Sequence, residues 1–131
     1  MKLSKNKAIT SVATFVSALL VAGMCFSAQI DKEAISTRCE MVYNTLDKMF
    51  EEQKHERCAY EVKYAGWMMQ GSAALVRAER YPDALKSLRI AEEKLSIIYV
   101  KHKQCPRLSR QVIPSLKEVN SLINELENTS N

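Results

Sequence analysis

Apolar residues recur at intervals of three and four along most of the chain, the spacing of one face of an α-helix. A first helix is predicted from about Asp31 to Lys54, with a stripe made of Ile35, Cys39, Val42, Leu46 and Met49. From Cys58 to Ala78 the chain has few charges and many Ala, Met, Trp, Tyr and Val residues, as expected for the most buried helix of a small bundle.

Prolines divide the rest of the chain into two more helices. Pro82 lies in the break Glu79 to Asp83, because proline disfavours helix in the preceding residue and is tolerated at the start of the next helix. The third helix is expected from Pro82 to Lys103, ended by Pro106, with the stripe Leu85, Leu88, Ala91, Leu95, Ile98 and His102. In the fourth, Pro114 either kinks the first turn or marks the true start, and the seam is Leu108, Val112, Leu116, Val119, Ile123 and Leu126.

These elements predict an all-α protein. Short connections force neighbouring helices to run antiparallel, so we expect an up-down-up-down four-helix bundle of about 100 residues, spanning 28–131. With three glycines and three prolines in 131 residues, the chain has too few turn formers for a many-stranded β-sandwich.

Part of this pattern resembles a single tetratricopeptide repeat. The residues that carry the resemblance are Ser72, Leu75, Tyr81-Pro82-Asp83-Ala84-Leu85, Leu88 and Ala91, within Ala65 to Ile98. The resemblance implies two closely crossing helices and a protein-binding role. Trp67 and Gly71 each lie one residue earlier than the repeat places them, and such repeats need about three units to bury a continuous core. An ordinary antiparallel hairpin is the alternative.

The first residues have the character of a secretory signal peptide. Three lysines without an acid precede an uncharged, mostly apolar run from Ala8 to Ala22, and small residues favour cleavage after Ser27. An uncleaved anchor helix is the alternative, and lipidation of Cys25 is disfavoured because Met24 precedes it. We therefore expect residues 1–27 to be removed, leaving a periplasmic or secreted protein without a stable membrane anchor.

Removing that segment changes the electrostatics. It takes away three lysines and lowers the formal net charge from +4 to +1, so a nucleic-acid partner loses its main support. A local basic cluster remains, formed by Lys101, His102, Lys103, Arg107 and Arg110. It is either a solvated helix end or a surface for an anionic partner.

The pattern Lys-His-x-x-Cys occurs twice, from Lys54 to Cys58 and from Lys101 to Cys105. In the predicted bundle both copies lie at turns at the same end, so their cysteines can come within the roughly 7 Å between Cα atoms that a disulfide requires. In an oxidising compartment the two thiols are expected to form a disulfide worth ~4 kcal/mol in the chain-entropy model.

A metal site is the alternative use of the same residues. Imidazole and thiolate groups converging from two turns can hold zinc or copper in a tetrahedral site, here made by His55, Cys58, His102 and Cys105. The two interpretations exclude each other, because an oxidised cystine offers no thiolates. The preferred interpretation is a disulfide with no cofactor.

The remaining cysteine and the methionines suggest structural roles. Cys39 lies on the apolar stripe of the first helix, which favours a buried free thiol over an intermolecular bond or a bond to Cys105. Met41, Met49, Met68 and Met69 are spaced as core residues rather than as copper or haem ligands.

No catalytic motif is present, so the sequence predicts a protein that is not an enzyme. The expected function is binding of another protein, as a periplasmic inhibitor, an immunity protein or a chaperone-like adaptor, and the second hypothesis is metal binding. Candidate partner-binding residues are Lys101, Lys103, Arg107, Arg110 and Trp67, and further aromatic anchors are Tyr43, Tyr60, Tyr64 and Tyr99.

Overall fold

The computed structural model of the chain describes residues 29–129, and every regular element in this range is a helix. The helices are α2 (Lys32–Glu52), α3 (Ala59–Arg77), α4 (Tyr81–Val100), α5 (Pro106–Gln111) and α6 (Ile113–Thr129). The expected signal peptide, residues 1–27, and the alternatives to it lie outside the described residues. The predicted all-α class is confirmed, but residues 29–129 form five helices and not four.

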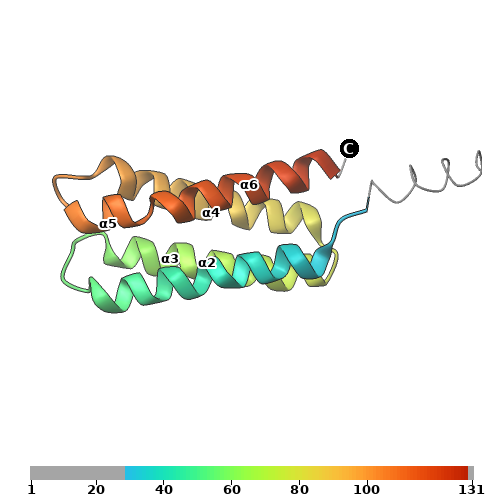
Figure 1. Cartoon of the computed structure of the whole chain (residues 1–131), viewed down its shortest axis with the longest axis horizontal. Helices are drawn as coiled ribbons and strands as arrows, with labels where there is room; N and C mark the ends of the chain where they lie inside the picture. The colour runs from blue at the N-terminus through green and yellow to red at the C-terminus, as the bar shows by residue number, and fades with distance from the viewer. Residues whose placement is uncertain (1–28, 130–131) are drawn as a thin grey trace, which may run out of the picture. The chain divides into compact units, whose positions relative to one another are not determined.

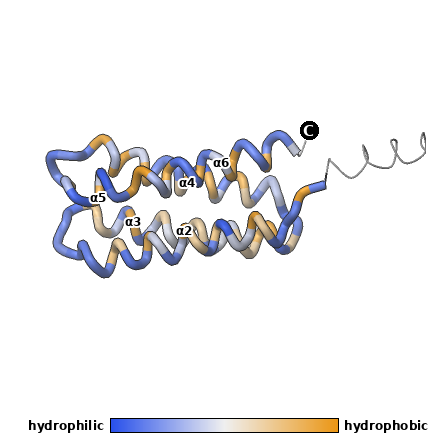
Figure 2. Tube along the Cα trace, in the orientation of Figure 1, coloured by the Kyte–Doolittle hydropathy of each residue, from blue (hydrophilic) through white to orange (hydrophobic). Residues whose placement is uncertain are grey.

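The four long helices lie side by side and alternate in direction (Figure 1). α3 packs between α2 and α4, while α6 packs on α4 and more loosely on α2. The α2–α3 and α4–α5 connections lie at one end of the bundle, and the α3–α4 turn lies at the other. Both connections at the first end are hydrophilic (Figure 2). The predicted helical bundle is therefore present, with the two Lys-His-x-x-Cys segments at one pole.

α2 begins where its first residues find a cap. The Asp31 carboxylate accepts a hydrogen bond from the Ala34 N–H at 3.0 Å, which satisfies one of the free donors at the helix start. The predicted stripe is buried except at its end, where Met49 is half-buried and Phe50 takes the core position. Phe50 comes one residue after the predicted Met49. This position directs the last apolar side chain of α2 toward α3, where the ring of Phe50 contacts Tyr60.

The α3–α4 turn closes with a left-handed residue. Glu79 has φ 59°, and the N–H groups of Glu79 and Arg80 donate to the carbonyls of Val76 and Leu75, both at 2.9 Å. This pair of bonds is a Schellman motif, which usually carries glycine at the left-handed position. Pro82 follows within the first turn of α4, as its position in the sequence predicts.

The predicted fourth helix is divided at Val112. Pro114 has no N–H to donate to the carbonyl of Arg110, so the helical ladder stops at Gln111 and resumes with α6. The direction changes little, because Val112 still donates to Leu108 at 3.0 Å and accepts from the Leu116 N–H at 2.8 Å. Of the two alternatives for Pro114, the start of a helix is therefore confirmed.

Candidate functional site

The two Lys-His-x-x-Cys segments are joined by a disulfide. Cys58 and Cys105 are both buried, their Cα atoms are 5.9 Å apart, and the bond closes a separation of 47 residues. Each cysteine lies at the residue just before a helix, α3 for Cys58 and α5 for Cys105. The predicted pairing is confirmed, and it ties the α2–α3 hairpin to the start of α5.

A carboxylate that the sequence pattern did not single out reinforces this pole. Glu56 accepts hydrogen bonds from the backbone N–H groups of Arg107 at 2.9 Å and Leu108 at 3.1 Å. These two donors belong to the first turn of α5, so a side chain from the α2–α3 connection caps a helix 51 residues away. Glu56 and the disulfide therefore fasten the same two segments.

The histidines of the proposed metal site do not approach the sulfurs as ligands. His55 and His102 are both exposed, and both lie in connections between helices. His102 was predicted on the apolar stripe of the third helix, but α4 ends at Val100. The disulfide occupies both sulfurs, and within residues 29–129 no three His, Cys, Asp or Glu side chains gather as metal ligands do.

Cys39 is the free cysteine of the described chain, and it is fully buried in α2. Desolvation of the thiolate in the core raises the pKa of Cys39 from 9.0 to about 12. The thiol therefore stays protonated at neutral pH and is unsuited to nucleophilic chemistry. The prediction of a buried free thiol is confirmed, and the alternative of a bond to Cys105 is wrong.

The basic cluster and Trp67 do not form one surface. Lys101 and Lys103 lie in the α4–α5 connection, and Arg107 and Arg110 are exposed on α5. Trp67 lies on α3, nine residues after Cys58, which is about 13 Å of helix from the disulfide pole. The five candidate partner-binding residues are thus divided among three segments, the α4–α5 connection, α5 and α3.

A shallow depression borders the basic cluster. It has a volume of about 250 Å³ and is lined by Tyr99, Val100, His102, Ser109, Arg110 and Ile113. Tyr99 and Val100 are both at least half exposed at this site. It offers one fixed cation beside apolar side chains, without an acid and base pair that would suggest catalysis.

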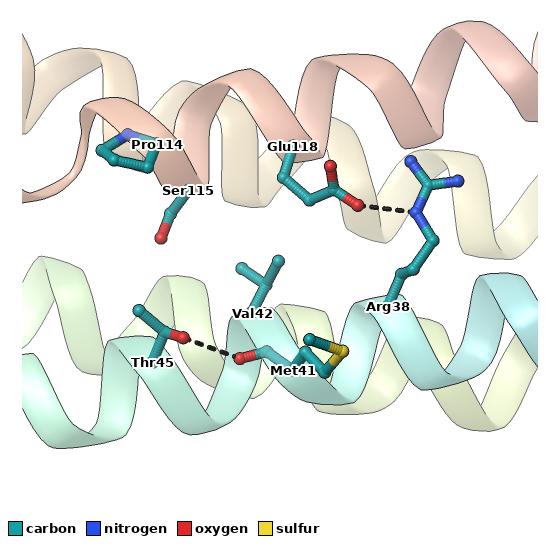
Figure 3. A pocket seen from close by; sticks show the side chains of 7 residues that line it. All are labelled: Arg38, Met41, Val42, Thr45, Pro114, Ser115 and Glu118. Carbon is teal, nitrogen blue, oxygen red and sulfur yellow. Dashed lines mark hydrogen bonds and ion pairs between the residues drawn. The ribbon is translucent and has the colours of Figure 1, made fainter.

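A second depression, of about 220 Å³, lies where α2 and α6 pack loosely (Figure 3). Its lining residues are Arg38, Met41, Val42, Thr45, Pro114, Ser115 and Glu118. Arg38 Nε donates to Glu118 Oε1 at 2.6 Å across the groove, and this hydrogen bond raises the pKa of Arg38. The groove is apolar along its floor and bridged by an ion pair at one end.

Three exposed aromatic side chains lie on the outward surface of α3. Tyr60, Tyr64 and Trp67 are 73%, 40% and 52% exposed, at a spacing of four and three residues that places them on one face of the helix. We call these three residues the aromatic face. Their helix packs its opposite side, rich in Ala, Gly and Ser, against α2 and α4.

Lysines contact two of the three rings of the aromatic face. Lys63 Nζ lies 4.4 Å from the ring centroid of Phe50 and 5.7 Å from that of Trp67. Lys94 of α4 lies 5.3 Å from the centroid of Tyr64. All three are cation–π contacts, and neither ammonium group forms an ion pair with a carboxylate of residues 29–129. The aromatic face is therefore bordered by positive charge.

Comparison with other proteins adds no further constraint on these sites. Within residues 29–129 no helix combines the length and apolar character needed to cross a membrane. The chain matches no family model, no curated protein and no solved structure.

Proposed function

We propose that this chain is an exported, non-enzymatic protein that acts by binding protein through the aromatic face of α3. The classes that suit it are a periplasmic inhibitor, an immunity protein and a chaperone-like adaptor. The observation that carries the proposal is the exposure of Tyr60, Tyr64 and Trp67 together on one helix face. Tyrosine and tryptophan are the residues most often found as energetic anchors of interfaces.

The area of apolar surface that this face exposes to water supports the proposal. An aromatic side chain buries roughly 150–250 Å² when it is fully covered, and these three are 73%, 40% and 52% exposed, so a partner could cover about 250–400 Å² of them, near the lower end of the largest patches on typical monomeric proteins. Such patches mark interaction sites in soluble proteins. The contacts from Lys63 and Lys94 fix two of the rings before a partner arrives, which lowers the entropy lost on binding.

Export is supported by the chemistry of the cysteines and by the amino-terminal sequence. Disulfides persist in oxidising compartments and are rare in the cytosol, and this chain has one between Cys58 and Cys105. Its first 27 residues have the charge and apolar pattern of a signal peptide. A periplasmic or secreted location is the interpretation that accommodates both features.

Site-specific photo-crosslinking in the producing cell tests the binding site. A photoreactive amino acid replaces Trp67 in one variant and Asn124, exposed on α6 across the bundle, in a matched control. We expect a covalent adduct from position 67 and none from position 124. No adduct from position 67, or equal adducts from both positions, would contradict the proposal.

A further inference from the structure

Small residues continue the aromatic face to the end of α3 with the spacing of a coiled coil: Gly71 is half-buried, Ala74 is exposed, and Ala78 is exposed directly after the helix. Gly71, Ala74 and Ala78 follow Tyr60, Tyr64 and Trp67, so that the intervals along the helix alternate between four and three residues. This is the a and d spacing of a heptad repeat, in which each position points toward a second helix. It extends over roughly 27 Å, at 1.5 Å per residue. We call these six residues the α3 seam.

Gly71 has no reason inside the molecule to be glycine. It does not have a positive φ, and a Cβ atom at this position would meet only Ser87 Oγ, at 3.9 Å. Glycine in the middle of a helix is less stable than alanine, because it loses more backbone freedom on folding. Gly66 differs, since its Cβ would contact both Leu46 and Tyr43 at 3.6 Å in the core. The space beside Gly71 thus opens outward, where another surface can approach closely.

The α3 seam has large residues in its first half and small residues in its second half. On this basis, and resting on the proposed function of the aromatic face, we propose that its occupant is the same seam of a second copy, paired antiparallel. In one register Trp67 lies against Gly71 of the second copy, Tyr64 against Ala74 and Tyr60 against Ala78. A two-fold axis generates each of these pairs twice, as a self-complementary interface requires.

Antiparallel pairing fits the sizes of the side chains better than parallel pairing. In the parallel arrangement the three aromatic residues would meet their own copies, and Gly71 would face Gly71 across a gap. In the antiparallel register every layer joins one large and one small side chain, which fills the interface evenly at the density of a protein interior. Each layer also joins an a position to a d position, as antiparallel coiled coils do.

The charges beside the seam suit the same register. On the side of α3 that faces α2, Lys63 lies at the aromatic end and Arg77 at the other end. Arg77 is already paired with Glu33 and Glu40 of α2. Antiparallel pairing brings the unpaired ammonium of Lys63 opposite these two carboxylates of the second copy. The side of the interface next to α2 therefore joins opposite charges, because Glu33 and Glu40 accompany Arg77 where it lies near Lys63 of the other copy.

The first test measures the association of the exported chain by sedimentation over a range of concentrations. Wild type is expected to dimerise, and Gly71→Leu is expected to raise the dimer Kd by about 30-fold or more, because the new side chain fills the space that Trp67 of the second copy occupies. The matched control Asn124→Leu adds the same side chain to α6 and should dimerise like wild type. A monomeric wild type, or a dimer that Gly71→Leu leaves intact, overturns the inference.

Melting curves separate misfolding from loss of the dimer. Leucine is a better helix former than glycine, and a Cβ atom at position 71 meets only Ser87 Oγ, at the ordinary contact distance of 3.9 Å, so we expect Gly71→Leu to fold. At concentrations where both proteins are monomeric, we expect the variant to melt about 4 °C above wild type. A lower melting temperature would show that Gly71 is needed within the bundle, which contradicts the argument.

The second test fixes the register by disulfide trapping in the exported chain. Tyr64→Cys and Ala74→Cys are made as separate proteins, mixed and oxidised. The mixture should form a covalent heterodimer, and each variant alone should not. Cys39 is buried and the other two cysteines are paired, so they do not compete. Linkage within Tyr64→Cys alone would indicate another register and overturn the proposed one.

The two proposals fail in different ways. A photo-crosslink from position 67 to a different protein, together with a monomeric chain, would overturn pairing with a second copy and leave the proposed binding function standing. The absence of any adduct from position 67 would overturn both. An adduct that contains two copies of this chain supports both.

Discussion

Loss of the disulfide should be the most damaging small change to the stability of this bundle. The variant that tests it replaces both cysteines, Cys58→Ala with Cys105→Ala, and leaves the rest of the pole unchanged. The bond joins residues 47 apart in sequence. For a closed loop of this length the chain-entropy model gives a stabilisation of about 4 kcal/mol, because the cross-link restricts the unfolded chain.

That loss is a large part of what a domain of this size has. Small domains unfold with a free energy of about 5–15 kcal/mol, so we expect the double variant to be marginally folded at 37 °C. Its melting temperature should fall by about 20 °C, at 4–8 °C for each kcal/mol in a domain of this length. The assay is thermal and urea unfolding followed by circular dichroism at 222 nm, with wild type treated with reductant as a second comparison.

Single replacements separate the cross-link from the local packing of each cysteine. Either Cys58→Ala or Cys105→Ala removes the whole cross-link, so each should cost nearly as much as the double replacement. Additive losses would mean that the side chains act separately and that loop closure is not the source of the stability. A double variant within about 1 kcal/mol of wild type would refute the reasoning outright.

Three further changes test individual parts of the fold. Because burial raises the pKa of Cys39 from 9.0 to about 12, the thiol ionises first in the unfolded chain. Wild type should therefore lose more unfolding free energy than Cys39→Ala between pH 9 and 12. Glu79→Gly should raise the unfolding free energy by about 1 kcal/mol, because glycine adopts the left-handed conformation without strain. Glu79→Ala keeps that strain and also loses the exposed ion pair with Lys32, so it should not raise the unfolding free energy. Glu56→Gln should lower the unfolding free energy by about 1 kcal/mol, because it weakens the cap of α5. Backbone hydrogen exchange in α5 should become faster. Glu52→Gln serves as the exposed control.

The meeting of the two cysteines at one end of the bundle could be predicted, because short connections leave few possible topologies. Two antiparallel hairpins must place their first and third turns at the same end, so the topology brings Cys58 close to Cys105 without knowledge of any contact. The sequence could not reveal Glu56, because a carboxylate in a charged turn is ordinarily solvated. Only the three-dimensional approach of α5 gives this one two donors.

The aromatic face could not be predicted as a surface from periodicity. α3 is apolar on both sides, with Ala59, Ala65 and Ala73 on one and Tyr60, Tyr64 and Trp67 on the other. A pattern of this kind identifies a helix without telling which side faces the core. The small residues are inside because α2 and α4 approach closely, and the large rings are then left outside.

The boundary of α4 shows how a tertiary constraint overrides local helix propensity. The stripe predicts a helix to Lys103, but the chain leaves the helix after Val100. The carbonyl of Lys101 then accepts hydrogen bonds from the N–H groups of Gln104 and Cys105, which form a tight turn. This turn directs Cys105 inward to meet Cys58, a demand that no pattern within residues 82–103 contains.

Trp67 is the single tryptophan of the chain, and its indole is half exposed in the native protein. Its fluorescence emission should already lie near the wavelength of a hydrated indole, so denaturation should shift the spectrum only slightly. Covering the ring with an apolar surface should instead move the emission to the blue and shield it from soluble quenchers such as iodide. At concentrations where the chain is monomeric, the emission of Trp67 should therefore change little on unfolding, whereas it should respond strongly when a partner surface covers α3.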